Sequence, residues 1–256
     1  ERNGIDESDF KALCTVCSIL GIKNSDYEAH KDDFVQNKKL ADMLWKLKSG
    51  QPLQYVIGKW DFYESEFYVG EGVLIPRPET EELVEKAIDY IKTLGKCVVY
   101  DLCSGSGCIG ISIAKKCSNA FVYLIEKSDD ALFYLKKNAD KIKNVKVLQG
   151  DICNIKEFDF LENADVIISN PPYIRQDELA NLQSEVKNEP LMALDGGKDG
   201  LDFYRVINDN WYSKLNDKGK LFLEIGNEQG ESIFNVLYEF ENISVIKDLY
   251  GNDRIV

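Results

Sequence analysis

The spacing of hydrophobic and polar positions changes several times along this chain. Within residues 1–50 the apolar residues recur at helical spacing, at Phe10, Leu13, Val16, Cys17 and Leu20 and again at Leu40, Met43, Leu44 and Leu47. Ser8 suits the N-cap of the first helix and Gly21 its end. The sequence Ser49-Gly50-Gln51-Pro52 then interrupts the helical pattern. These features predict a helical N-terminal domain over residues 1–50.

The pattern beyond this boundary predicts a β-hairpin followed by a helix. Residues 55–74 are rich in Tyr, Phe, Val and Trp, with glycines at 58, 70 and 72, which is typical of a hairpin. After Ile75-Pro76-Arg77-Pro78, one face of a predicted helix carries Leu83, Val84, Ala87, Ile88 and Ile91. We therefore expect residues 51–78 to link the helical domain to a third region, residues 79–256.

Short apolar runs and helical patterns alternate through this third region. The apolar runs cover residues 97–101, 121–125, 145–148, 165–169 and 221–225. Such runs are typical of parallel strands that are buried on both faces. Helical patterns lie between most of them, as at 129–138 and 202–215. The alternation predicts a doubly wound α/β sheet, in which ligands bind at the carboxyl ends of the strands.

Composition and charge narrow the function classes. The 256 residues are 44% hydrophobic and 29% charged, the mixture of a soluble globular protein. The net charge of −13 opposes stable binding to nucleic acid. No apolar run approaches the roughly 18 residues that span a bilayer, so we expect no membrane contact. The seven cysteines are an odd number and indicate reduced thiols in a cytosolic protein.

A glycine-rich loop, residues 101–110 (DLCSGSGCIG), directly follows a predicted strand and opens a predicted helix. Glycines in such a turn let the backbone approach a ligand and direct free N–H groups toward it. Glu126 ends the next strand, where its carboxylate can accept hydrogen bonds from ribose hydroxyls. Gly105, Gly107 and Gly110 also match G-x-G-x-x-G. A nicotinamide dinucleotide is therefore an alternative ligand, and a tight turn without a ligand is another interpretation.

The sequence Asn170-Pro171-Pro172-Tyr173 follows the predicted strand 165–169 at the same edge of the sheet. The two prolines favour an extended backbone and remove two donors, so we expect some backbone carbonyls to face the pocket. The Asn170 amide offers one acceptor and two donor hydrogens, and Tyr173 offers a flat surface for stacking. Together these groups can hold a planar amide or amino group. The alternative is a proline-stiffened loop without a ligand.

With several further stretches, these two motifs resemble the class I methyltransferases that use S-adenosylmethionine, and among them the peptide chain release factor glutamine N5-methyltransferases. The matching stretches are residues 51–58, 74–81, 101–110, 149–151, 170–174, 189–190 with 193–194, 199–201 and 251–254. Asn-Pro-Pro-Tyr also occurs in methyltransferases that act on DNA or RNA amino groups, whereas Ile75-Pro-Arg-Pro-Glu-Thr80 narrows the choice. The resemblance implies a mainly parallel, seven-stranded sheet and a substrate-binding role for the helical domain.

The resemblance also implies a role for individual residues. The cofactor methionine would lie over a loop consisting of Cys103, Ser104, Gly105, Ser106 and Gly107. Glu126 would hold the ribose, and Asp151 and Ile152 would border the adenine. Asn170 would lie between cofactor and substrate, and the substrate would contact Asn170, Pro171, Pro172 and Tyr173. In this interpretation Asn170 and Tyr173 are catalytic. Cys103 replaces the family's usual first glycine, and Glu126 replaces a more common Asp.

The implied reaction is methyl transfer from S-adenosylmethionine to the side-chain amide of the glutamine in the Gly-Gly-Gln motif of a bacterial class I release factor. S-Adenosylhomocysteine would be the product, and no metal would be required. The alternatives are methylation of a ribosomal-protein glutamine and methylation of an exocyclic amino group in DNA or RNA. A nicotinamide-dependent oxidoreductase would leave residues 170–173 without a role.

Other reactive residues have simpler interpretations. Cys14 and Cys17 match C-x-x-C, but no second pair completes a zinc site, so we expect buried thiols. His30 is the only histidine and lies among charged residues, which predicts a surface position. Arg77 either shapes the pocket or forms an anchoring salt bridge.

Overall fold

The computed structural model describes residues 7–33, 35 and 37–256. Residues 1–6, 34 and 36 of the predicted helical domain lie outside these ranges. The N-terminal part contains α1 (Ser8–Leu20), a 3-10 turn (Asn24–Asp26), α2 (Tyr27–His30) and α3 (Asn37–Lys48). Gly21 ends α1 at a φ of 71°, as predicted, but the N-cap is Glu7 and Ser8 is already helical. An apolar cluster of Cys14, Met43, Leu47, Leu53 and Val56 holds α1 and α3 together.

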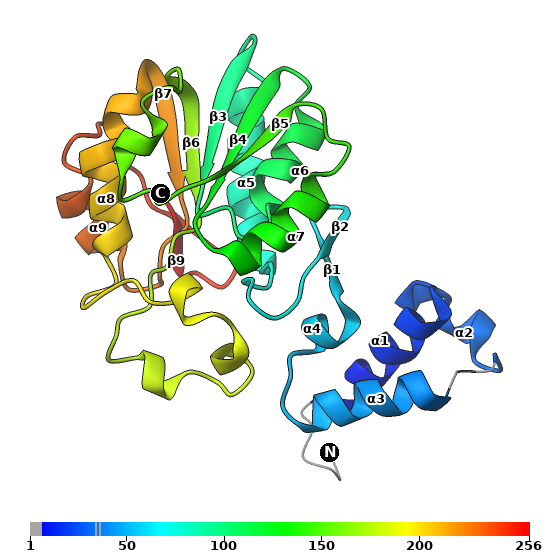
Figure 1. The fold of residues 1–256 in the computed structure, drawn as a ribbon. Helices are drawn as coiled ribbons and strands as arrows, with labels where there is room; N and C mark the ends of the chain where they lie inside the picture. The colour runs from blue at the N-terminus through cyan, green and yellow to red at the C-terminus, as the bar shows by residue number, and fades with distance from the viewer. Residues whose placement is uncertain (1–6, 34, 36) are drawn as a thin grey trace.

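The predicted linker contains a helix as well as a hairpin. Strands β1 (Lys59–Phe62) and β2 (Ser65–Tyr68) pair antiparallel, which confirms the hairpin. The preceding residues form α4 (Leu53–Ile57) instead of a strand, because Leu53 and Val56 pack on the N-terminal helices. Gly58 then ends α4 at a φ of 82°. Figure 1 shows α4 and the hairpin between the N-terminal helices and the sheet.

Five parallel strands form the main sheet, in the order β5-β4-β3-β6-β7 (Figure 1). The strands are β3 (Cys97–Leu102), β4 (Ala120–Glu126), β5 (Val145–Gln149), β6 (Ala164–Ser169) and β7 (Leu215–Leu223). The doubly wound α/β fold is thus confirmed, with its topological switch between β3 and β6. Strand β7 begins at Leu215, earlier than predicted, and its register with β6 shifts between Ala164 and Val166.

The remaining two strands of the described chain are antiparallel. Strands β8 (Ile246–Lys247) and β9 (Asp253–Ile255) pair with each other. A bridge between Glu224 and Ile255 attaches β9 to the end of β7. The expected seven strands are therefore realised as five parallel strands and a short antiparallel pair at the edge.

Helices cover both faces of the sheet (Figure 1). One face packs against α5 (Pro78–Ile91), α6 (Cys108–Lys116) and α7 (Asp129–Ala139), and the other against α8 (Asp202–Val206) and α9 (Gly230–Val236). The helix predicted at 202–215 continues from α8 as a π-helical segment (Ile207–Trp211) and a 3-10 turn (Tyr212–Lys214). No helix in the described ranges is both long and apolar enough to cross a membrane.

Residues 170–201 connect β6 to α8, and most of this connection is a long segment, residues 175–201. It contains 3-10 turns at Leu179–Asn181, Val186–Asn188 and Leu191–Ala193; a further 3-10 turn (Ile155–Phe158) precedes β6. The segment reaches the N-terminal helices, where Lys11 forms an ion pair with Glu185. Asn188 Nδ2 also donates a hydrogen bond to the Gly50 carbonyl at 3.0 Å. Segment 175–201 therefore contacts the N-terminal domain beside the carboxyl edge of the sheet.

Candidate active site

A cleft opens at the carboxyl ends of β3, β4 and β6. Among the residues predicted for the site, its lining includes Cys103, Ser104, Gly105, Ser106, Glu126, Asp151, Ile152, Asn170 and Pro172. Segments 72–77 and 190–193 supply further parts of its wall. The cleft encloses about 1040 Å³ when the space open to solvent is counted. Sequence-distant motifs are thus assembled around one cleft.

The three glycines of the loop have different structural roles. A Cβ placed on Gly105, where φ is +54°, would meet no atom within 4 Å, so this backbone faces open space. Gly107 turns the chain into α6 at a φ of +81°, and a Cβ there would lie 2.4 Å from a Leu135 methyl carbon. A Cβ on Gly110 would lie 2.3 Å from a methyl carbon of Leu124. Only Gly105 leaves backbone open to a ligand; Gly107 and Gly110 permit the turn and the packing of α6.

Cys103 adopts a backbone conformation that favours glycine. Its φ is 58°, in the left-handed region. This geometry gives a physical reason for the glycine that the resembling family usually has at this position. Burial raises the pKa of the Cys103 thiol well above its usual value, which keeps the thiol neutral.

The Glu126 carboxylate lies beneath the glycine loop and binds its backbone. One oxygen, Oε2, accepts the Gly105 N–H at 2.7 Å. The other accepts the N–H groups of Lys127 and Ser128, both at 2.8 Å. Burial raises the pKa of Glu126, and these N–H groups oppose that effect. A carboxylate offers about four acceptor directions, so three bonds leave room for a ligand hydroxyl.

Asp151 and Ile152 form a polar and an apolar part of the neighbouring wall. Burial acts to raise the pKa of Asp151, but an ion pair with Lys127 at 2.7 Å and the Cys153 N–H lower it overall. The Ile152 side chain is buried, and its carbonyl accepts the Trp211 indole N–H at 2.9 Å. This arrangement presents an apolar surface with a fixed charged edge, which suits a flat heterocycle.

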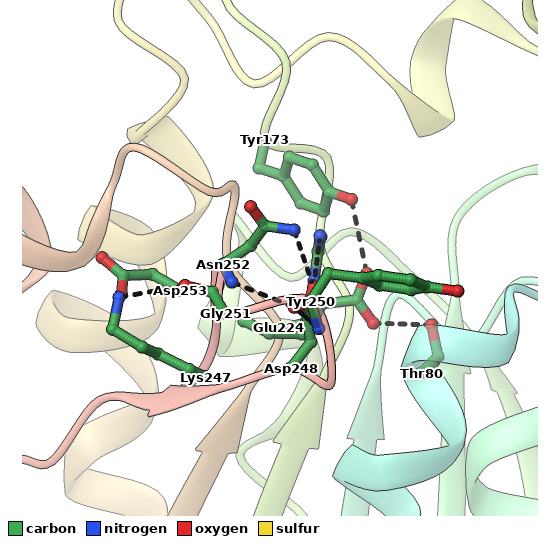
Figure 2. A network of polar contacts seen from close by, with 10 residues as sticks. Thr80, Tyr173, Glu224, Lys247, Asp248, Tyr250, Gly251, Asn252 and Asp253 are labelled. Atoms are coloured by element: carbon green, nitrogen blue, oxygen red, sulfur yellow. Dashed lines mark hydrogen bonds and ion pairs between the residues drawn. The ribbon is translucent and has the colours of Figure 1, made fainter.

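Asn170 is connected to two buried side chains from other elements. Its Nδ2 donates to the Thr80 hydroxyl at 3.2 Å, and Thr80 donates to Glu224 Oε2 at 2.5 Å. Tyr173 approaches the other oxygen of Glu224, at 3.3 Å, as Figure 2 shows. No described residue donates a hydrogen bond to Asn170 Oδ1 or to the Pro171 carbonyl. Two acceptors at the end of β6 are thus available to a ligand.

Pro171 and Tyr173 are placed differently from the rest of the predicted site. They line a smaller pocket that shares Leu74, Arg77, Asn170 and Ala193 with the main cleft. Tyr173 directs its hydroxyl to Glu224, and burial raises the pKa of that hydroxyl. Gly107 lines neither pocket, and its predicted contact with the cofactor remains a prediction. The predicted stacking role of Tyr173 remains a prediction.

The sequence interpretation missed Thr80, Glu189 and Glu224. Glu224 had a usable signal, because a carboxylate inside the apolar run 221–225 must find partners when it is buried. Arg77 forms an ion pair with Glu189, which also accepts the Ile75 N–H at 3.0 Å. The salt-bridge interpretation of Arg77 is therefore confirmed, and the same side chain lines the cleft.

The simpler interpretations of the other reactive residues agree with the structure. Cys14 and Cys17 are buried, and all seven cysteines are unpaired. His30 is partly exposed and contacts Asp33 through its Nδ1 at 2.7 Å. No described group of three or more His, Cys, Asp or Glu side chains has the arrangement of a metal site.

Comparisons with known proteins identify relatives over most of the chain. A family model described as a methyltransferase domain matches residues 94–207. A release factor glutamine methyltransferase from Thermodesulfovibrio yellowstonii is 39% identical over 251 residues, covering 94% of this chain and 88% of the relative. The protein of that name from Clostridium acetobutylicum is 38% identical over 244 residues, covering 93% and 84%.

A solved structure supports the fold. The SAM-dependent methyltransferase from Agrobacterium tumefaciens matches with a TM-score of 0.51 and 17% identity, covering 71% of this chain and 57% of that one. At this identity the match bears on the fold alone.

Proposed function

The chain belongs to the release factor glutamine methyltransferase family, and we propose that it transfers a methyl group from S-adenosylmethionine to the side-chain amide nitrogen of a release factor glutamine. Within the site, two available hydrogen-bond acceptors support the proposal, Asn170 Oδ1 and the Pro171 carbonyl. A primary amide has two N–H hydrogens on one nitrogen, and two fixed acceptors can orient that nitrogen. We further propose that the glutamine is the one in the Gly-Gly-Gln motif.

The residues of the cleft suit S-adenosylmethionine. Glu126 has acceptor capacity left for ribose hydroxyls, and the open backbone at Gly105 permits close approach of the methionine part. Cys103, Ser104 and Ser106 would complete this cradle, with Asp151 and Ile152 beside the adenine. The two carboxylates also complement a cationic ligand. When bound, S-adenosylmethionine supplies an activated methyl group on a positively charged sulfur, and S-adenosylhomocysteine is the product.

The chain's own contribution is mainly to hold and orient the amide nitrogen that receives the methyl group. An amide nitrogen is a poor nucleophile because its lone pair is delocalised into the carbonyl group. Hydrogen bonds from its NH₂ to Asn170 Oδ1 and Pro171 would fix the nitrogen toward the methyl group. Orientation of two reactants in this way contributes about 7–11 kcal/mol in favourable cases. Tyr173 and Pro172 would form the walls against the flat amide.

We propose that the protein substrate approaches over segment 175–201. Leu191 and Met192 are 60% and 55% exposed on this segment, and Met192 also lines the cleft. The same segment contacts the N-terminal helices through Lys11 and Gly50. Residues 1–50 would thus form the substrate-binding domain, 51–78 the linker and 79–256 the catalytic domain.

The test is incubation with methyl-labelled S-adenosylmethionine and a panel consisting of a release factor, ribosomal proteins, DNA and RNA. We expect label in the release factor, and none when its Gly-Gly-Gln glutamine is replaced by alanine. Label that enters only nucleic acid or a ribosomal protein would contradict the proposal. Binding of NAD without binding of S-adenosylmethionine would favour the oxidoreductase alternative.

A further inference from the structure

The buried carboxylate of Glu224 lies behind Asn170 and Thr80 and does not itself line the cleft. It lies just beyond β7 and is 1% exposed, and its two oxygens accept hydroxyls from Thr80 and Tyr173 (Figure 2). The Tyr204 hydroxyl donates to its backbone carbonyl at 2.9 Å. Burial raises the pKa of Glu224 overall, and the Thr80 hydroxyl and the nearby Arg254 cation act in the opposite direction. Each carboxylate oxygen is contacted by a hydroxyl group, an arrangement of two donors that fits the acceptor-only form.

The chemistry of this carboxylate determines the direction of the next hydrogen bonds. An ionised carboxylate can only accept, so the single hydrogen of the Thr80 hydroxyl points to Glu224. The Thr80 oxygen is then left as an acceptor, and the group 3.2 Å away on Asn170 must be its NH₂. The amide oxygen of Asn170 is consequently the atom presented to the ligand.

Resting on the proposed function, we propose that Glu224 and Thr80 are positioning residues that hold the Asn170 amide in one of its two orientations. In this orientation Asn170 accepts from the substrate NH₂. In the reversed orientation it would present its own NH₂ to that group, and two donors would face each other. The arrangement therefore favours a substrate whose methyl-accepting nitrogen carries N–H groups that donate hydrogen bonds.

Isosteric variants separate this role from general stability. Thr80→Val removes the hydroxyl, and Glu224→Gln replaces the acceptor-only carboxylate with a group that also donates. We expect each to lower the single-turnover rate constant of release factor methylation at least tenfold, while the Kd for S-adenosylmethionine changes less than threefold. Thr80→Ser keeps the hydroxyl and should restore the rate to within threefold of wild type. Thr93→Val, beyond the end of the same helix, is the matched control and should leave the rate unchanged.

A double-variant comparison tests whether Thr80 acts through Asn170. Thr80→Val added to Asn170→Ala should cause no further loss of rate, because the amide to be oriented is already absent. Thermal unfolding of every variant checks that the folded fraction is equal. The positioning role would be overturned, with the proposed function intact, by any of three results: a wild-type rate for Thr80→Val, a parallel loss of cofactor binding, or independent losses in the double variant. If the wild-type protein does not methylate the release factor, both the proposed function and the positioning role are overturned.

Discussion

The two sides of the cleft are built in different ways. The side that we propose for the cofactor, called the cofactor side, consists of the 101–110 loop and Glu126, whose hydrogen bond to Gly105 joins residues only 21 apart in sequence. The acceptor side depends on side-chain bonds from Asn170 to Thr80 and from Thr80 to Glu224, which join residues 90 and 144 apart. The cofactor side thus uses local backbone geometry, whereas the acceptor side uses long-range side-chain contacts.

Because the two sides are built differently, we expect substitutions on each side to have different effects. In the proposed function, a change beneath the glycine loop would alter how the cofactor is held, because the contacted groups are backbone N–H groups and one carboxylate. A change in the hydrogen bonds among Asn170, Thr80 and Glu224 would alter which atom of Asn170 faces the proposed substrate. We therefore expect cofactor affinity and transfer rate to respond to different substitutions.

Asn170→Ala is expected to give the largest effect. It removes an acceptor for the substrate NH₂, and misplacement of a reacting group costs about 100-fold in rate. Methyl transfer should fall by roughly that factor or more, while the affinity for S-adenosylmethionine stays within about threefold. Single-turnover methylation and an independent cofactor titration measure the two quantities. Full activity in this variant would exclude the proposed role of Asn170.

Glu126→Gln should lower the affinity for the cofactor and leave the transfer rate at saturation nearly unchanged. Hydrogen bonds to a charged group contribute about 1.5–3 kcal/mol, so we expect cofactor affinity to fall roughly 10- to 100-fold. The rate at saturating cofactor should change little, because the acceptor side is untouched. Calorimetric titration of S-adenosylmethionine and its demethylated product measures the affinity. Unchanged affinity would show that Glu126 only supports the loop.

Asp101 allows a test of stability on the cofactor side. This buried carboxyl accepts the Gly110 N–H at 2.9 Å, its Oδ1 has no partner in the described chain, and burial raises its pKa to about 7. Its ionisation therefore costs folding free energy, and this cost grows from about pH 4 to about pH 7 and is constant above. Asp101→Asn does not titrate, so its stability relative to wild type should increase by roughly 2–3 kcal/mol from pH 5 to pH 8.

Urea unfolding at both pH values, without cofactor, measures this difference. Because other titrating groups are common to both proteins, their contributions cancel in the comparison. An equal difference at pH 5 and pH 8 would show that Asp101 titrates outside this range.

Cys103→Gly should give the smallest effect. Glycine relieves the left-handed backbone conformation at a φ of 58° but adds freedom to the unfolded chain. These effects oppose each other, so we expect the free energy of unfolding to change by less than about 1 kcal/mol. Cofactor affinity should be retained or improved. A large loss of affinity would show instead that the thiol supports the loop.

The sequence predicts the cofactor side better than the acceptor side, for a physical reason. The alternation of strands and helices and the glycine loop depend on residues close in sequence, and both agree with the structure. The strand predicted at residues 55–57 is wrong because Val56 packs on distant helices. The Thr80–Glu224 hydrogen bond can be predicted only when the packing of α5 against the end of β7 is known. Only the unusual acid in an apolar run pointed toward it.

We infer that the two sides of the cleft control different steps: one cofactor binding, the other methyl transfer. The most direct test of this claim is single-turnover methylation of a release factor over a range of S-adenosylmethionine concentrations, with wild type, Asn170→Ala and Glu126→Gln in parallel. We expect Asn170→Ala to lower the maximal rate without moving the half-saturating concentration, and Glu126→Gln to raise that concentration without lowering the maximal rate. Parallel changes of both quantities in both variants would contradict the claim.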